Sequence, residues 1–312
     1  MAQEVTISMK ARYLLSAGLV TLVLLGAPSC QRSPASTKKS IVVTYSVLGS
    51  IVKEMVGDKA TVTVSIPNGL DPHEWEPSAR DIEAINKADL VVENGLGLEG
   101  GMEKTLDSAR DRGVKFFTAS DHIEIRHVGP GEGTPSGDTD QATGAPDPHF
   151  WMSPTAMKSV VSALAPQLMK DLNLDVTSQA SNLERRLDDL NSEIAGMIAP
   201  IPQQNRKLVT GHESMGYFAQ LYGFKLVGVI IPSLSTQAGV SAADLATLKE
   251  AIQDNAVRAI FTELGTSPAI ASRIGDDTGA RVVELTTHTL PADGSYFTFL
   301  RDVAIVITNA LK

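Results

Sequence analysis

Short apolar runs rich in β-branched residues alternate with stretches of helical spacing along most of this chain. Each run spans four to six residues, which is the length of a buried strand. Alternation of strand and helix predicts βαβ units, in which a mainly parallel sheet is flanked by helices, so the fold class is α/β. The predicted strands lie at residues 41–45, 61–66, 89–93, 114–118, 207–210, 225–230, 259–263 and 281–285.

One longer helix interrupts this alternation and divides the chain. Its apolar residues are Leu183, Leu187, Leu190, Ile194 and Met197. They recur at steps of four, three, four and three, which predicts one apolar stripe on a helix of about six turns, roughly 33 Å long. Two prolines follow residue 199 and end the helix. We therefore expect two α/β lobes, at residues 41–175 and 203–312, joined by one long rigid helix within residues 176–202.

The N-terminus has the pattern of a secretory leader. Lys10 and Arg12 precede an apolar run at residues 13–25, and small residues then lead to Cys30. This order is typical of a signal peptide, and the run is short for a membrane span. A cysteine directly after the small residues resembles a bacterial lipoprotein signal, which predicts a leader at residues 1–30, lipidation of Cys30 and a polar tether at residues 31–40. Plain cleavage, with the cysteine lost or unmodified, is the alternative.

Charge and cysteine content exclude several classes of function. The chain has 27 basic and 36 acidic residues and a net charge of −9, which argues against nucleic-acid binding. Its single cysteine lies in the leader, so an internal disulfide, a Cys-rich zinc site and an iron–sulfur cluster are excluded. Any metal site must therefore be built from His, Asp and Glu.

Four of the six histidines fall where predicted strands give way to helices. His73 and His149 each follow Asp-Pro in a loop before a helix, whereas His212 and His288 each follow a strand. In an open α/β sheet this is the carboxyl edge, where ligands bind. A single histidine is more often a core or surface residue than a ligand, but four in the same kind of location predict a shared site. The acidic loop at residues 128–148 is too long to be an ordinary connection, and loops of this length are usually either functional or disordered.

Other chemistries have weaker support. Residues 95–100 fit G-x-G-x-x-G between a strand and a helix, and Asp121 follows the next strand, as in a dinucleotide-binding turn. Against this, the turn follows the third strand of its lobe, and secretion separates the chain from the nicotinamide pool. The motifs G-x-S-x-G, H-E-x-x-H and the P-loop are absent. Glu213 or Glu74, each beside a histidine, could act as the base of a metallohydrolase.

Four stretches, at residues 71–78, 94–99, 147–151 and 212–218, resemble the periplasmic metal-binding proteins of zinc and manganese ABC importers. The resemblance runs in order from about residue 41 to the C-terminus. It implies a solute-binding protein of the cluster A-I type, which holds one metal ion between two lobes with two ligands from each. It also accounts for the glycine-rich turn, which that family carries without binding a nucleotide.

When the motifs of that family are matched to this sequence, the resemblance implies that His73 and His149 are the ligands of the first lobe. It implies that His212 is a ligand of the second lobe. The fourth position is usually a carboxylate after the last strand, and the matching residue here is His288. Glu284 or Glu263 could contribute instead. Three or four imidazoles favour Zn²⁺, since Mn²⁺ prefers oxygen ligands.

The resemblance implies that the protein captures extracytoplasmic Zn²⁺ and delivers it to the membrane permease of an ABC importer. No bond is made or broken, so we expect a binding protein and not an enzyme. We also expect a monomer anchored by its lipid at the periplasmic or extracytoplasmic face of the membrane. A manganese importer component, an adhesin on the same fold and, less well supported, a secreted zinc hydrolase are the alternatives. Because only neutral imidazoles bind metal, affinity is expected to fall as the pH drops through about 6.5.

Overall fold

The computed structural model describes residues 38–129, 132 and 143–312. The predicted leader at residues 1–30, the lipidation site Cys30 and most of the tether at residues 31–40 lie outside the described residues. Most of the acidic loop at residues 128–148 also lies outside them. Within the described ranges, no helix is both long enough and apolar enough to cross a membrane.

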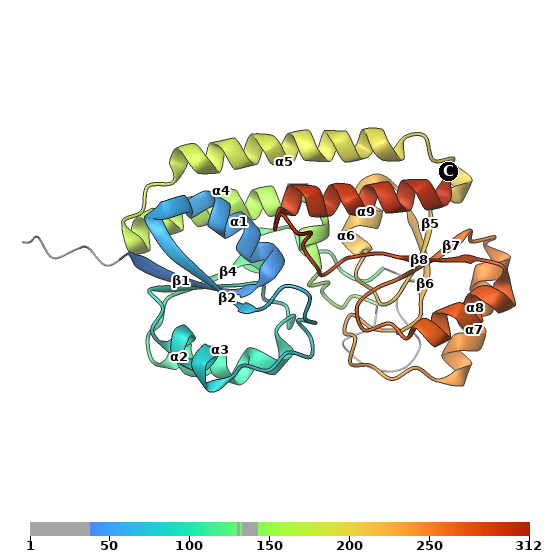
Figure 1. Cartoon of the computed structure of the whole chain (residues 1–312), viewed down its shortest axis with the longest axis horizontal. Helices are drawn as coiled ribbons and strands as arrows, with labels where there is room; N and C mark the ends of the chain where they lie inside the picture. The colour runs from blue at the N-terminus through green and yellow to red at the C-terminus, as the bar shows by residue number, and fades with distance from the viewer. Residues whose placement is uncertain (1–37, 130–131, 133–142) are drawn as a thin grey trace, which may run out of the picture. The chain divides into compact units, whose positions relative to one another are not determined.

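The first lobe is built on a sheet (Figure 1), whose parallel strands lie in the order β2-β1-β3-β4. Its strands are β1 (Lys39–Tyr45), β2 (Ala60–Ile66), β3 (Leu90–Glu93) and β4 (Phe116–Thr118). β1 begins two residues before the predicted strand, because Lys39 and Ser40 pair in register with Ala60 and Thr61. The four strands are parallel, so their carboxyl ends lie at one edge of the sheet.

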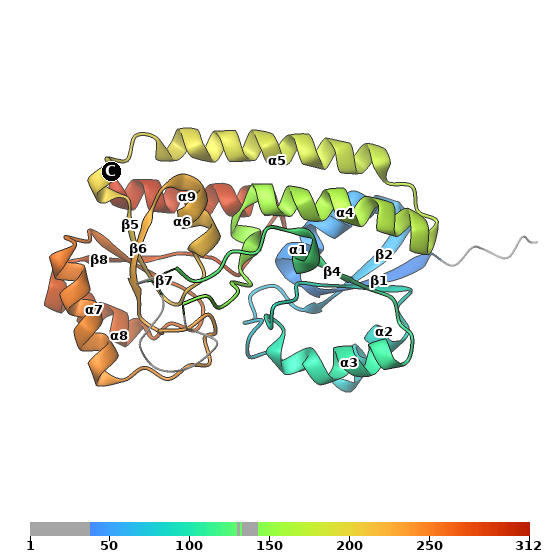
Figure 2. The ribbon, with the colours of Figure 1, turned by 180° about the vertical axis from the view of Figure 1, so that it is seen from behind.

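Helices cover both faces of this sheet (Figures 1 and 2). They are α1 (Ser46–Val56) and α4 (Pro154–Leu172) on one face, and α2 (Ala79–Asn86) and α3 (Glu103–Asp111) on the other. Alternate residues of β1 serve the two faces: Ile41 and Val43 are buried with the α1 and α4 side, whereas Val42 is buried with the α2 and α3 side. A capping box begins α2, because the side chains of Ser78 and Asp81 cap the start of the helix reciprocally.

The second lobe contains two parallel strand pairs instead of one continuous ladder. Its strands are β5 (Lys207–Thr210), β6 (Lys225–Val229), β7 (Ala259–Thr262) and β8 (Arg281–Glu284). β5 pairs with β6 and β7 pairs with β8, while β5 and β7 lie side by side. The flanking helices are α6 (Gly216–Tyr222), α7 (Ala242–Asp254) and α8 (Pro268–Thr278). The predicted α/β architecture with two lobes is therefore confirmed.

One long helix joins the lobes, as expected, and a second long helix at the end of the chain packs along it. α5 (Thr177–Ile198) packs on α4 and also on α9 (Tyr296–Leu311), which reaches α1 of the first lobe (Figures 1 and 2). The buried residues of α5 are Ala180, Leu183, Leu187, Leu190, Ile194 and Ile198. The apolar stripe thus ends on Ile198, four residues after Ile194, while Met197 is only half-buried.

Short 3₁₀ helices occupy several of the connections. They are η1 (Gly57–Lys59), η2 (Gly100–Met102), η3 (Ala119–His122), η5 (Phe150–Met152) and η6 (Gln203–Asn205). η2 lies at the end of the glycine-rich turn, and η5 begins directly after His149.

Candidate metal centre

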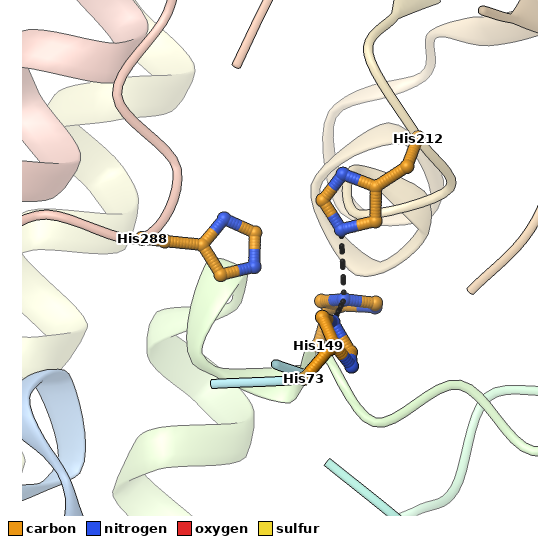
Figure 3. Close-up of side chains that lie close together, drawn as sticks. All are labelled: His73, His149, His212 and His288. Carbon is orange, nitrogen blue, oxygen red and sulfur yellow. Dashed lines mark hydrogen bonds between the residues drawn. The ribbon is translucent and has the colours of Figure 1, made fainter. Parts of the chain in front are cut away.

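Four imidazoles converge where the two lobes meet (Figure 3). They form the histidine cluster, which consists of His73, His149, His212 and His288. One ring nitrogen from each lies within 4.8 Å of the others, and at most 4% of any of these residues is exposed. The structure thus brings together the four histidines that were predicted from their places after strands.

The spacing of the nitrogens suits a tetrahedral metal. The Nε2 atom of His149 lies 3.3 Å from the Nε2 atom of His73 and 3.3 Å from that of His212. Zinc–nitrogen bonds of about 2.0–2.1 Å place the corners of a tetrahedron about 3.3–3.4 Å apart. These two separations therefore match edges of a tetrahedral zinc–nitrogen site, while the four nitrogens as a group lie within 4.8 Å of one another.

The two Asp-Pro-His motifs fold alike at the backbone but differ at the side chains. Oδ1 of Asp71 accepts a hydrogen bond from the backbone N–H of His73, and Oδ1 of Asp147 accepts one from that of His149, each 2.9 Å long. Asp147 Oδ1 also lies 2.9 Å from Nδ1 of His149. A carboxylate there selects the tautomer with a proton on Nδ1 and leaves the Nε2 lone pair facing the cluster.

Arg126 supports Asp147 from behind. Its Nη1 lies 3.1 Å from Oδ2 of Asp147, and its Nη2 bonds to Glu132 of the acidic loop. The side chain of Asp147 is fully buried and that of Arg126 is 9% exposed. No sequence motif marks Arg126, and its position beside the acidic loop is the one signal of its role.

Glu263 bonds to the loops of the second lobe that carry His212 and His288. Its carboxylate accepts hydrogen bonds from the backbone N–H of Gly211 at 3.0 Å, from the Ser214 hydroxyl at 2.6 Å and from the Thr287 hydroxyl. Its Oε2 lies 3.5 Å from Nδ1 of His212. Glu263 therefore stands behind the cluster as a partner of its loops and is not one of the converging ligands.

The hydroxyl of Thr287 bonds to both Glu263 and His288. The hydroxyl of Thr287 donates to Glu263, so Nδ1 of His288, 2.7 Å from the same hydroxyl, acts as the donor to it. Nε2 of His288 is then unprotonated, and it is buried without a hydrogen-bond partner among the described residues. Glu284, the other alternative for this position, is exposed at the end of β8 and does not belong to the cluster.

Burial keeps the cluster neutral. Loss of solvation, reinforced by the neighbouring histidines, lowers the pKa of His73 to about 3, and burial lowers that of His212 to about 4. The same causes hold the pKa values of His149 and His288 well below 6.5. Burial therefore favours the neutral form of these imidazoles, which is the form that binds a metal, below the pH at which a free imidazole titrates. The fall of metal affinity at low pH stays a prediction.

The other two histidines and the glycine-rich turn do not belong to the histidine cluster. His122 and His127 are exposed, and His122 stacks on Phe117 with ring centroids 4.6 Å apart. In the glycine-rich turn, the carboxylate of Glu99 accepts hydrogen bonds from the backbone N–H groups of Asn94 and Gly95. Because the turn binds its own carboxylate, these groups are not free for a phosphate, which argues against a dinucleotide site.

A cavity of about 570 Å³ leads to the cluster between the lobes. Residues from both lobes line it, including His73, Gly97, Pro148, Ser233 and Gln237. His73 is the member of the cluster that reaches this cavity.

Comparison with known proteins places the chain in a family. The family described as zinc-uptake complex component A, periplasmic (ZnuA), matches residues 41–310. The manganese-binding lipoprotein MntA of Halalkalibacterium halodurans is 23% identical over 286 residues, which are 89% of this chain and 90% of MntA. The zinc-binding lipoprotein AdcA of Streptococcus pneumoniae is 30% identical over 278 residues, which are 88% of this chain but only 54% of AdcA.

Solved structures agree on the fold. The periplasmic zinc-binding protein TroA of Treponema pallidum aligns with a TM-score of 0.75 and 24% identity, covering 88% of this chain and 99% of TroA. Since the family match spans most of the chain, this protein belongs to the ZnuA family of periplasmic zinc-uptake components.

Proposed function

We propose that this protein captures Zn²⁺ at the histidine cluster between its lobes and delivers it to the permease of an ABC importer. Membership of the ZnuA family supports a binding role in metal uptake. The imported ion is the substrate of this process, and the protein acts as its extracytoplasmic carrier.

The observation that carries the choice of zinc is the set of four buried, neutral imidazoles. Two of their Nε2–Nε2 separations are 3.3 Å, the edge of a tetrahedral zinc–nitrogen site. Mn²⁺ favours oxygen-rich octahedral sites, and the cluster offers it nitrogen only. Manganese remains the second candidate, because relatives that cover most of this chain are named for manganese.

The same donor set favours transport over hydrolysis. A catalytic zinc ion keeps one position open for water, whereas four protein ligands fill the tetrahedron. We therefore place this chain among carriers and not among metallohydrolases.

We further propose that Cys30 carries a lipid that anchors a monomer to the membrane. Relatives that are named lipoproteins support this anchor. A Cys30→Ser variant should move from the membrane fraction to the soluble fraction, whereas plain cleavage would leave wild type soluble as well.

The test is a competition titration of the metal-free protein against a chromophoric chelator, with Zn²⁺ and Mn²⁺ in turn. His288→Ala removes one cluster member, and His127→Ala is the matched control, because His127 is exposed and lies outside the cluster. We expect wild type and His127→Ala to bind one Zn²⁺ tightly and Mn²⁺ weakly, and His288→Ala to bind zinc less tightly. Tighter binding of Mn²⁺ would overturn the choice of zinc, and no tight binding of either ion would overturn the carrier role.

A further inference from the structure

The loop that carries His288 belongs to the second lobe in sequence, but the first lobe holds its backbone. The indole Nε1 of Trp151 donates a 2.9 Å hydrogen bond to the carbonyl oxygen of Thr287. The hydroxyl of Tyr45, at the end of β1, donates a 3.0 Å hydrogen bond to the carbonyl oxygen of His288 itself. Two consecutive carbonyls at the ligand are therefore fixed from across the lobe junction.

Asn68 extends this contact two residues further. Its Nδ2 donates to the carbonyl oxygen of Leu290 at 2.9 Å, and its Oδ1 accepts from the backbone N–H of Leu290 at 2.7 Å. Asn68 thus pairs with one residue of the loop in both directions, as a strand neighbour would.

Ring packing adds a second restraint. Trp151 lies between two ligands, with its ring centroid 5.2 Å from that of His149 and 5.4 Å from that of His288. Tyr45 packs on Trp151 at 4.9 Å, and the two side chains are essentially fully buried. Trp151, which lies two residues after His149, therefore restrains the orientation of the His288 ring.

His212 is held differently. Its backbone N–H is 3.3 Å from Glu263, and its carbonyl oxygen accepts a hydrogen bond from the Thr210 hydroxyl, so both contacts lie within the second lobe. The second lobe also reaches the loop of His288 through the side chain of Thr287. The backbone of His288, however, is bonded to the first lobe.

We propose that Tyr45 and Trp151 are positioning residues that fix His288 in the cluster from the first lobe. This inference rests on the proposed zinc-binding function. It separates the four proposed zinc ligands into a group of three and a single fourth ligand. His73, His149 and His288 form a preassembled set on the first-lobe side, and His212 is the ligand that closes on it. Moving His288 away would break buried hydrogen bonds to both of its flanking carbonyls, whereas moving His212 with its lobe would break none of them.

Tyr45→Phe is the sharpest test, because it removes one hydroxyl and keeps the ring. Tyr222→Phe is the matched control, since its hydroxyl donates a 3.0 Å hydrogen bond to Asn191 at the contact of α6 with α5. Loss of a partner outside the ligand set commonly lowers metal affinity about 10–100-fold. We expect Tyr45→Phe to weaken zinc binding by about tenfold and Tyr222→Phe to leave it essentially unchanged.

A double-mutant cycle separates positioning from general damage. If Tyr45 acts through His288, Tyr45→Phe should have little further effect on zinc affinity in a His288→Ala background. Asn68→Ala serves as a second variant, because Asn68 is exposed and its loss should not impair folding. The visible absorption of bound Co²⁺ reports coordination, and it should lose four-coordinate intensity in Tyr45→Phe and in Asn68→Ala but not in Tyr222→Phe.

The outcomes distinguish this inference from the function on which it rests. If wild type does not bind zinc tightly, the proposed function fails. If wild type and His288→Ala behave as proposed but Tyr45→Phe binds zinc like wild type, with an unchanged Co²⁺ spectrum, the inference alone is overturned. Equal losses from Tyr45→Phe with and without His288 would also overturn it, because the effect would then not pass through this ligand.

Discussion

Replacing Asp147 with asparagine should weaken zinc binding far more than the same replacement of Asp71, although both residues begin an Asp-Pro-His motif. Oδ1 of Asp147 accepts hydrogen bonds from both the backbone N–H and Nδ1 of His149, and Oδ2 faces Arg126. Oδ1 of Asp71 accepts only the backbone N–H of its histidine, and Oδ2 accepts the hydroxyl of Thr236. Only one of the two carboxylates therefore touches an imidazole.

The magnitude follows from the donors that an amide cannot satisfy. In Asp147→Asn, the amide oxygen can face either His149 or Arg126, and the NH₂ group then meets the donor on the other side. Breaking a buried charge pair costs about 3–5 kcal/mol when one charge is left unpaired. Because Arg126 keeps Glu132, we expect a loss of about 2–3 kcal/mol in stability and at least about tenfold in zinc affinity. Asp71→Asn keeps an acceptor for the backbone and a partner for a hydroxyl, so its effect should be small.

The assay is the chelator competition at pH 7.5, together with thermal unfolding of the metal-free proteins. Asp147→Asn should shift both the zinc affinity and the unfolding midpoint, whereas Asp71→Asn should shift neither by much. Equal zinc affinities for the two variants would refute the claim that the carboxylate at the imidazole matters for binding. A loss of stability without a loss of affinity would assign Asp147 to folding alone.

Three further predictions follow from burial and packing near and away from the cluster. Burial raises the pKa values of three carboxyl groups, to about 6 for Asp147, about 7 for Glu263 and about 8 for Glu213. Because a bound dication favours their ionised forms, zinc binding should release protons at pH 7, and zinc affinity should rise from pH 6 to 8. Calorimetry in buffers of different ionisation enthalpy measures the number of protons released, and a value of zero would contradict the prediction. In Gly211→Ala, the new Cβ would lie 2.1 Å from Oγ1 of Thr266, so the loop before His212 must shift and zinc affinity should fall about tenfold in the titration. Leu187→Ala opens a cavity under α5, where the side chain is 1% exposed, and should lower the free energy of unfolding by about 2–5 kcal/mol in denaturant melts while zinc affinity stays unchanged.

Local patterns were enough to predict the elements and the histidines that the structure brings together. The apolar stripe that begins with Leu183 and Leu187 predicted a helix within residues 176–202, where α5 lies, because such a stripe on a long helix is a strong periodic signal. The histidines were found for a related reason. Parallel strands put all their carboxyl ends at one edge, so residues that follow strands are brought together even when they are far apart in sequence.

Contacts between distant segments were not predictable in this way. The role of Arg126 depends on its approach to Asp147, 21 residues away, and that of Tyr45 depends on a loop 243 residues away. The two Asp-Pro-His motifs are the same in sequence and make the same backbone hydrogen bond. Their aspartates differ in burial and in the partners of their side chains, which tertiary packing decides.

The presence of His288 where the family resemblance implies a carboxylate changes the charge balance of the site. Four neutral imidazoles bring no negative charge to a dication, and a buried charge without compensation is strongly unfavourable. Two carboxylates lie behind the imidazoles: that of Asp147 is 2.9 Å from Nδ1 of His149, and that of Glu263 is 3.5 Å from Nδ1 of His212. A carboxylate behind a ligating imidazole raises its basicity without occupying a coordination position. In the proposed zinc site, these carboxylates would offset part of the charge of the ion without taking a coordination position, although Asp147 also pairs with Arg126. This accounts for a Glu263 that is buried beside the cluster and yet outside it.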